Sequence, residues 1–203
     1  MTGIIDYGMG NIGSLVNMVE RLGENTLIIS DTSGVKNADK LILPGVGSFD
    51  NGIKRIKECG LWDLLNRSVL IDKIPILCIC LGMQLITKRS DEGNLEGLGW
   101  IDAEAIKFTF VDKSVKVPHM GWNQVKFIKD SKLLNGIPGD PRFYFVHSYY
   151  VRCNSENDIL GITNYHNDFV SVIEKGNIFA TQFHPEKSHK YGLGLIKSFI
   201  ELC

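Results

Sequence analysis

The chain has 203 residues, with 22 Lys and Arg against 23 Asp and Glu. That length suits one α/β domain, expected over residues 1–203, with no room for a separate acceptor-substrate domain. A formal net charge of −1 gives no field that would attract nucleic acid or an anionic membrane, so neither is expected as a partner. The chain shows no secretory leader pattern and no apolar stretch of membrane-spanning length, which favours a cytoplasmic protein.

Cysteine usage excludes two common architectures. The five cysteines are Cys59, Cys78, Cys80, Cys153 and Cys203. They form neither an even disulfide framework nor paired CxxC spacing for a metal. We therefore expect free thiols, one of them reactive, and no metal or other cofactor.

The first half of the chain alternates strand and helix patterns. Apolar runs at 2–6, 25–30 and 40–43 predict strands, and an amphipathic pattern at 11–22 predicts a helix. A second helix pattern at 49–66 leads into a buried strand at 74–79. This alternation is typical of a doubly wound parallel sheet with crossover helices.

The second half has shorter strand patterns separated by turn residues. The predicted strands are 100–110, 116–117, 123–128, 143–152, 159–163, 169–175 and 177–183, and a closing helix is predicted at 192–202. These strands indicate antiparallel additions to the parallel sheet.

Cys80 lies at the junction between the strand at 74–79 and a helix predicted at 81–88. A cysteine at a sharp strand-to-helix turn projects its sulfur beyond the sheet, beside helix N–H groups that favour a thiolate. Gly82 would let the strand and helix cross closely. A lone cysteine in an apolar run is more often an inert core residue, so a second site has to support the reactive interpretation.

That second site is His184 with Glu186. Pro185 disfavours helix at His184, and in an extended segment residues two apart share a face, so Glu186 can orient the imidazole. Cysteine, histidine and carboxylate together supply a nucleophile, its base and the group that orients the base. Zinc binding by His184, Glu186 and His189 is the competing hypothesis, but extended spacing does not readily bring the three together.

The N-terminal glycines offer another alternative. Gly8, Gly10 and Gly13 fit GxGxxG between a strand and a helix, and Asp31 follows at about the distance expected for a ribose contact. A dinucleotide site and a plain glycine turn are both compatible with this pattern.

Five motifs in order carry a resemblance to a known family. They are Pro44 to Gly47, Cys80 to Gln84, Pro118 to Asn123, Phe145 to Tyr149, and Gln182 to Ser188. The chain resembles the class I glutamine amidotransferases, and among them the glutaminase subunit of imidazole glycerol phosphate synthase. The resemblance implies a flavodoxin-like α/β fold with a doubly wound, mostly parallel sheet.

The implied activity is hydrolysis of L-glutamine to glutamate and ammonia through a thioester on Cys80. The ammonia would be channelled to a (β/α)8-barrel cyclase subunit, in a heterodimer serving histidine biosynthesis. The loop at 44–47 would reorient a peptide bond near Val46 when the partner's site is filled, so the isolated chain would be a poor glutaminase.

The resemblance also assigns roles to residues of this chain. The catalytic residues would be Cys80, His184 and Glu186; the oxyanion hole Val46, Gly47 and Leu81; the substrate contacts Gly47, Gln84, His147, Ser148 and Tyr149; and the partner interface Asn11, His119, Met120 and Trp122.

Two departures leave alternatives open. Cys78 stands where the family usually has glycine, and residues 100–103 lack the expected Pro–Gly turn. The second feature resembles paralogues that supply ammonia for amidation of an N-acetyl sugar of a surface polysaccharide. A stand-alone cysteine hydrolase shares the nucleophile and base but gives no reason for the partner segment at 118–123, and a non-catalytic module gives no reason for Cys80, His184 and Glu186.

Overall fold

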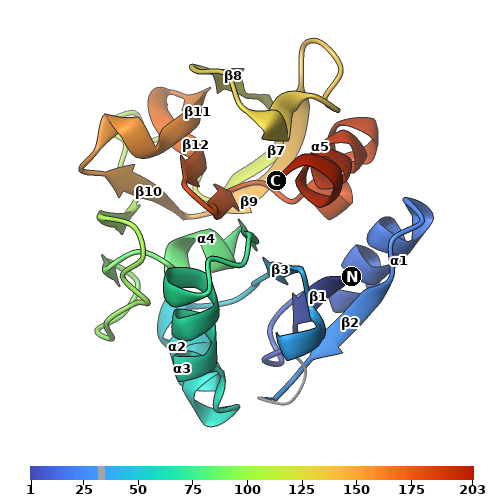
Figure 1. Cartoon of the computed structure of the whole chain (residues 1–203). Helices are drawn as coiled ribbons and strands as arrows, with labels where there is room; N and C mark the ends of the chain where they lie inside the picture. The colour runs from blue at the N-terminus through green and yellow to red at the C-terminus, as the bar shows by residue number, and fades with distance from the viewer. Residues whose placement is uncertain (32–34) are drawn as a thin grey trace.

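Parallel strands form the centre of the sheet in this computed structural model, which describes residues 1–31 and 35–203. In spatial order they are β2 (Thr26–Ile29), β1 (Thr2–Ile5), β3 (Lys40–Leu43), β4 (Ile76–Ile79) and β13 (Ile178–Thr181). Each is an apolar run, as expected for strands covered on both faces. Their carboxyl ends meet at one edge, where Figure 1 shows α4 beside β3.

Antiparallel strands extend this sheet beyond β13. They are β12 (Asn167–Lys175), β10 (Tyr149–Cys153) and β6 (Ala103–Lys107), with β11 (Ile159–Tyr165) and β8 (Lys126–Phe127) branching from β12. The short β5 (Arg89–Ser90) pairs in parallel with β6 at the edge. A separate two-stranded ribbon pairs β7 (His119–Gln124) with β9 (Arg142–His147). The expected α/β fold, with parallel strands and antiparallel additions, is confirmed.

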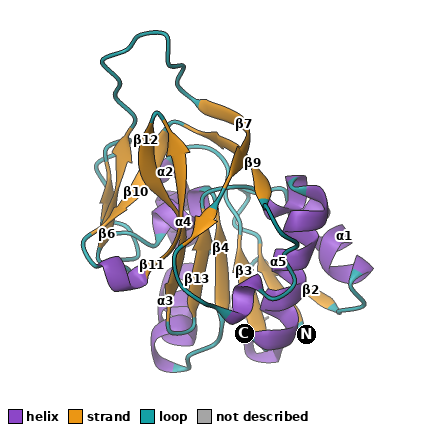
Figure 2. Cartoon of the chain, turned by 90° about the horizontal axis from the view of Figure 1, so that it is seen from above, coloured by secondary structure: helices purple, strands orange, loops and turns teal. Residues whose placement is uncertain are grey.

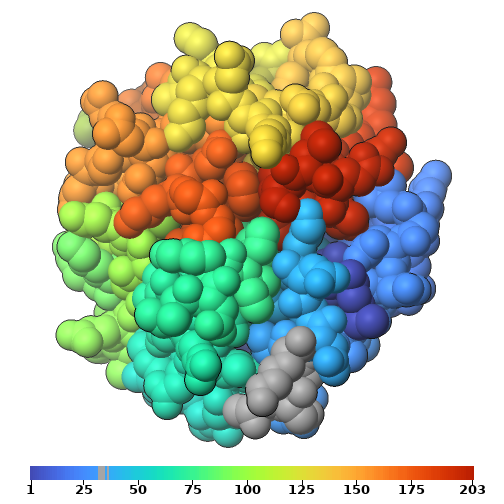
Figure 3. Space-filling model, viewed as in Figure 1, coloured from blue at the N-terminus to red at the C-terminus, as the bar shows by residue number. Residues whose placement is uncertain are grey.

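Helices cover both faces of the parallel strands. α1 (Ile12–Arg21) and α5 (His189–Leu202) pack on one face, and α2 (Phe49–Glu58) and α3 (Leu61–Asn66) pack on the other. On β4, Leu77 and Ile79 face the first pair, whereas Ile76 and Cys78 face the second. The first and last helices lie side by side, so both ends of the chain meet on one face (Figure 3).

Several element boundaries differ from the sequence predictions. The helix predicted at 49–66 is divided at Gly60, whose φ of 70° is left-handed and ends α2 before α3 begins. The helix predicted after Cys80 is the short α4 (Leu81–Leu85), and the strand predicted at 143–152 is interrupted at Ser148. The strand predicted at 116–117 is not formed, and the strand that does form there, β7, begins at His119.

Short helical segments complete the connections. They are 3-10 turns at Val35–Asn37, Lys132–Leu134, Glu156–Asp158 and Pro185–Lys187, and a π-helical segment at Arg67–Ile71. The loop that leads into β7 stands out from the body of the molecule (Figure 2). No helix within the described residues is both long and apolar enough to cross a membrane.

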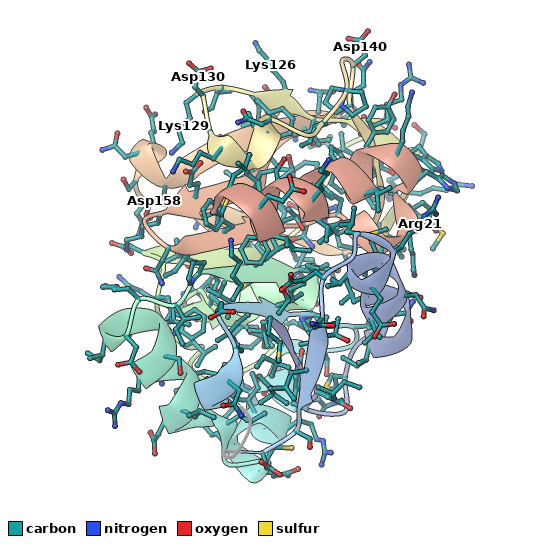
Figure 4. The ribbon with its side chains drawn as sticks, turned by 45° about the vertical axis from the view of Figure 1, so that its right-hand side comes forward. Arg21, Lys126, Lys129, Asp130, Asp140 and Asp158 are labelled. Carbon is teal, nitrogen blue, oxygen red and sulfur yellow. The ribbon has the colours of Figure 1, made fainter. Side chains whose placement is uncertain are left out.

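Surface charges of both signs lie close together at the edge formed by β8. Lys126, Lys129 and Asp130 project outward there (Figure 4). Lys129 Nζ also donates to the carbonyl oxygen of Asn157 at 2.6 Å. Such mixing fits the near-zero net charge of the sequence.

Candidate active site

Cys80 lies on a strained turn between β4 and α4. Its backbone has φ 54° and ψ −107°, an unusual conformation for a residue with a side chain. A Cβ atom on Gly82 would lie 2.1 Å from the carbonyl oxygen of Leu43, so only glycine lets α4 approach β3 this closely. The predicted sharp junction is therefore present, with the sulfur at a cavity wall.

The cavity at this turn has a volume of about 340 Å³. It gathers all the predicted catalytic, oxyanion and substrate residues except Glu186: Val46, Gly47, Cys80, Leu81, Gln84, His147, Ser148, Tyr149 and His184. It also includes Glu92, Pro118, Val146 and Lys187, which sequence reasoning did not select. Glu92 lies in a turn-rich segment without apolar periodicity, and nothing in its spacing links it to Cys80.

His184 and Glu186 form a buried pair beside Cys80. The distance from His184 Nδ1 to Glu186 Oε1 is 2.8 Å, and the imidazole also has a hydrogen bond with the Cys80 side chain. Burial lowers the pKa of His184, but the hydrogen bonds to Cys80 and Glu186 outweigh burial and raise it to about 10. The imidazole therefore carries a proton next to the sulfur at neutral pH.

Strand β9 and Ser188 hold His184 in place. The His184 backbone N–H donates to the Tyr144 carbonyl oxygen at 2.9 Å. Ser188 Oγ donates to the His184 carbonyl oxygen at 2.6 Å and accepts from the Tyr144 N–H at 3.0 Å. Backbone pairing and a buried hydroxyl thus fix the segment that carries both His184 and Glu186.

The loop from Pro44 to Gly47 lies against the start of α4. The Leu81 N–H donates to the Gly45 carbonyl oxygen at 3.3 Å, so this predicted oxyanion donor is engaged within the chain. A Cβ on Gly45 would lie 2.6 Å from Tyr7 Oη and 2.8 Å from Leu81 Cβ, which explains glycine there. Gly47 has φ 105°, a backbone region that glycine adopts most easily.

Two amide side chains lie behind Cys80. Gln84 Nε2 is 3.3 Å from the Tyr149 carbonyl oxygen and 3.2 Å from Gln182 Oε1. Gln182 Nε2 is 3.8 Å from Cys80 Sγ. His147 Nδ1 also donates to the Tyr149 carbonyl oxygen, at 2.7 Å. These contacts join the cavity wall to the sulfur.

The residues predicted to face a partner divide into two groups. Asn11 is exposed, as are Met120 (62%) and Trp122 (47%), whose ring stacks on His189 at 5.3 Å between centroids. His119 is only 3% exposed, so its expected place on the interface needs correction. Its side chain points inward because successive side chains of β7 point to opposite faces.

Inside the chain, His119 belongs to a buried aromatic cluster. Its ring stacks on Tyr165 and Phe145, at 4.0 and 4.8 Å between centroids. His119 Nδ1 lies 3.0 Å from His147 Nε2. Burial lowers the pKa of His119 to about 4 and that of His147 to about 3, so both imidazoles are neutral at pH 7.

Cys78 does not prevent the turn at Cys80. Its side chain is fully buried on the face of β4 that meets α2 and α3, and burial raises the pKa of its thiol. Cys80 packs with the cluster on the opposite face. A small side chain in place of glycine is therefore accommodated in the core.

The zinc and dinucleotide hypotheses gain no support from the folded chain. Among residues 1–31 and 35–203, no group of three His, Cys, Asp or Glu side chains could hold a metal ion. A Cβ on Gly10 would lie 3.0 Å from Pro44 Cγ, so the N-terminal glycine loop packs directly on the Pro44 loop. That contact accounts for a glycine of the GxGxxG pattern without a dinucleotide.

Comparisons with known proteins point to the same family. The model of the class I glutamine amidotransferase family matches residues 3–201. A Methanococcus maripaludis protein, imidazole glycerol phosphate synthase subunit HisH 2, is 52% identical over 99% of both chains. A protein of the same name from Pseudomonas aeruginosa is 46% identical over 98% of both chains, and Methanococcus maripaludis subunit HisH 1 is 44% identical over the full length of both.

The solved structures agree on the fold. A crystal structure described as a glutamine amidotransferase superposes with a TM-score of 0.77 over 99% of this chain and 97% of that one. Sequence identity is only 19%, so this likeness bears on the fold alone. Taken with the family model and the full-length relatives, it leads to one conclusion: the chain belongs to the class I glutamine amidotransferase family.

Proposed function

We propose that this chain is the glutaminase subunit of an imidazole glycerol phosphate synthase, which hydrolyses L-glutamine and supplies ammonia for histidine biosynthesis. The observation that carries the proposal is Cys80 and His184 at one small cavity, with Glu186 hydrogen-bonded to His184, in a chain that aligns along nearly its full length with HisH subunits. Nucleophile, base and orienting carboxylate are the groups that amide hydrolysis through a thioester requires.

The proposed chemistry uses Cys80 as the nucleophile and His184 as the acid and base. The Cys80 thiolate attacks the side-chain amide carbon of glutamine, forming a C–S bond and an oxyanion. As the C–N bond breaks, His184 gives its proton to the departing nitrogen, and ammonia leaves a thioester behind. Neutral His184 then takes a proton from water, which attacks the thioester and releases glutamate and the thiolate. Glu186 holds the imidazole in position through both steps.

The cavity wall offers complementary groups for the rest of glutamine. An α-amino acid carries an ammonium group, and Glu92 provides a carboxylate on this wall. Its Oε2 accepts the Phe49 N–H at 2.8 Å, which fixes the side chain at the start of α2. Gln84, His147, Ser148, Tyr149 and Gly47 are the remaining proposed substrate contacts.

The engaged Leu81 N–H supports control by a partner. Rotation of the Gly45–Val46 peptide would withdraw the Gly45 carbonyl from Leu81 and turn the Val46 N–H toward the same place. Both donors would then serve the oxyanion. We propose that a (β/α)8-barrel cyclase, in a heterodimer, docks over exposed Val46, Met120 and Trp122 and drives this rotation. The complex would work in the cytoplasm, where free thiols persist.

Replacement of the nucleophile tests the proposal. Cys80→Ala should abolish glutamine-dependent synthase activity of the complex but leave activity with ammonium salts, because only ammonia production is lost. Cys153→Ser, at a partly buried free thiol, serves as the matched control and should retain both activities. If glutamine-dependent activity survived in Cys80→Ala, the proposed nucleophile would be wrong.

A second acceptor is favoured by one observation. Methanococcus maripaludis has two HisH subunits, and this chain is 52% identical to number 2 and 44% to number 1. Two copies allow one to supply ammonia elsewhere, such as to the amidation of an N-acetyl sugar of a surface polysaccharide. Residues 100–103 are compatible with this alternative. Complementation of a histidine auxotroph lacking its glutaminase subunit distinguishes the acceptors, because growth requires the histidine-pathway partner.

A further inference from the structure

Gln182 is a buried polar residue to which the proposed mechanism gives no task. It follows β13 and precedes His184 by two residues, and it is 0% exposed. Its backbone N–H donates to the Ser171 carbonyl oxygen at 2.9 Å, so the side chain is not needed to hold that strand end. A buried amide is unfavourable unless its groups are hydrogen-bonded. The partners of this amide are Cys80 and Gln84.

The orientation of the Gln182 amide follows from a carbonyl group. The Tyr149 carbonyl oxygen can only accept, so the Gln84 atom that contacts it must be the donor Nε2. Gln84 Nε2 also contacts Gln182, which must therefore present its acceptor Oε1 there. The other end of the Gln182 amide, Nε2, consequently faces Cys80 Sγ at 3.8 Å. An N–H donor is thus fixed toward the sulfur.

We propose that Gln182 is a hydrogen-bond donor to the nucleophile, holding the Cys80 sulfur as a thiolate and directing it into the cavity, with Gln84 fixing the donor. This inference rests on the proposed role of Cys80. A hydrogen bond to the charged form of a group favours that form. His184 also faces the sulfur, but it must lose its proton during the reaction. The Gln182 amide keeps its proton throughout, so it can stabilise the thiolate again when sulfur leaves the thioester.

Several titratable groups surround Cys80 and have to be considered in any pH experiment. They are His184 with Glu186 behind it, Tyr7 and Cys78 beneath the turn, and Glu92, His147 and Lys187 across the cavity. A variant that changes none of these charges isolates the contribution of the amide. Gln182→Met meets this condition, because it keeps the length and approximate volume of the side chain without the donor.

The test is the pH dependence of Cys80 alkylation by iodoacetamide in the full-length chain, followed by mass spectrometry of the Cys80 peptide. Gln182→Met should raise the pH at which the alkylation rate is half-maximal (the midpoint) by about one unit, the scale of a lost hydrogen bond to a charged group. Gln84→Leu should raise it by less, because Gln182 stays but can rotate. Ser171→Ala, which removes the hydrogen bond from Thr163 Oγ1 in the same sheet, should leave the midpoint unchanged.

The outcomes separate this inference from the function itself. Unchanged midpoints in Gln182→Met would overturn the role of Gln182 while leaving Cys80 as the nucleophile. An equal rise in Gln182→Met and Ser171→Ala would also overturn it, because general loosening would then account for the shift. If Gln182→Met failed to fold, Gln84→Leu would decide, and an unshifted midpoint there would count against the proposal. Glutamine-dependent activity that survived in Cys80→Ala would instead overturn the proposed function.

Discussion

The turn that carries Cys80 and the loop that carries Val46 line the same cavity, but only the turn has its groups already positioned for catalysis. At the turn, the sulfur already has His184 and Gln182 as partners, and His184 already has Glu186. At the loop, the Gly45 carbonyl oxygen accepts the Leu81 N–H that an oxyanion would need. The proposed nucleophile thus has its partners in place within the chain, whereas the proposed oxyanion site is closed.

This difference separates two costs of catalysis. A thiolate and a positioned imidazole allow attack on glutamine, but each missing oxyanion donor costs about 3 to 4 kcal/mol of transition-state stabilisation. Under the proposed mechanism, a chain with only the first of these in place would bind glutamine while consuming little of it. Control then requires movement of a single peptide group, in place of refolding of the site.

The largest effect is expected from the residues positioned beside Cys80. His184→Ala should lower kcat for glutamine by about a thousandfold or more, because no group remains to protonate the leaving nitrogen. Glu186→Gln should cost less, about tenfold to a hundredfold, because the imidazole remains but is less firmly oriented. His166→Asn, at an exposed histidine, is the control. Equal losses in the His184 and Glu186 variants would assign the carboxylate a different task.

The next effect concerns the proposed oxyanion site at the loop that carries Val46. Glutamine hydrolysis by the purified chain should rise by about a hundredfold or more when the cyclase partner and its acceptor ligand are added, the scale of one regained donor. Trp122→Ala should reduce this stimulation without changing the basal rate, whereas Ile71→Ala, an exposed apolar residue before β4, should not. Identical rates with and without partner would favour a stand-alone hydrolase.

A smaller effect is expected from the histidines behind the cavity. His119 has a pKa of about 4 in the folded chain against an ordinary value of 6.5. A depressed folded pKa means that stability is complete above pH 6.5 and is lost as pH falls toward 4, because the unfolded chain gains the proton first. His119→Phe keeps a ring for stacking but cannot titrate. Urea unfolding gives the free energy of unfolding of the wild type and of His119→Phe. The wild-type value minus the variant value should fall by at least about 1 kcal/mol between about pH 6.5 and 4. A constant difference would contradict a neutral His119.

Sequence reasoning was most successful where function depends on local geometry. The apolar run before Cys80 and the glycine after Leu81 predicted the turn. The short spacing of His184 and Glu186 predicted their contact, but the extended segment expected between them is wrong, because Pro185–Lys187 forms a 3-10 turn. In both cases neighbours along the chain determine where the side chain points. The parallel strands were equally accessible, because burial on both faces makes each an uninterrupted apolar run.

Contacts between distant segments were not accessible in this way. Ser188 braces His184 because β9 lies beside it, and Gln182 meets Cys80 because β13 pairs with β4. His119 turned out to be buried because of the register between β7 and β9, which places it opposite His147. No local pattern of polar residues encodes such pairings, so these three residues required the folded chain.

The smallest effect is expected at Cys78. Its replacement tests whether the turn at Cys80 depends on this side chain of β4. Cys78→Ala removes a fully buried sulfur from the core beside α2 and α3, so the free energy of unfolding should fall by about 1 kcal/mol. Glutaminase activity of the complex should stay within about twofold, because Cys80 is held by Gly82, the Thr181 carbonyl oxygen and its side-chain partners. Mass spectrometry after treatment with an electrophilic glutamine analogue should find the adduct on Cys80 in both proteins. An adduct on Cys78, or a loss of activity comparable to that of His184→Ala, would mean that the two cysteines had been assigned to the wrong faces of β4.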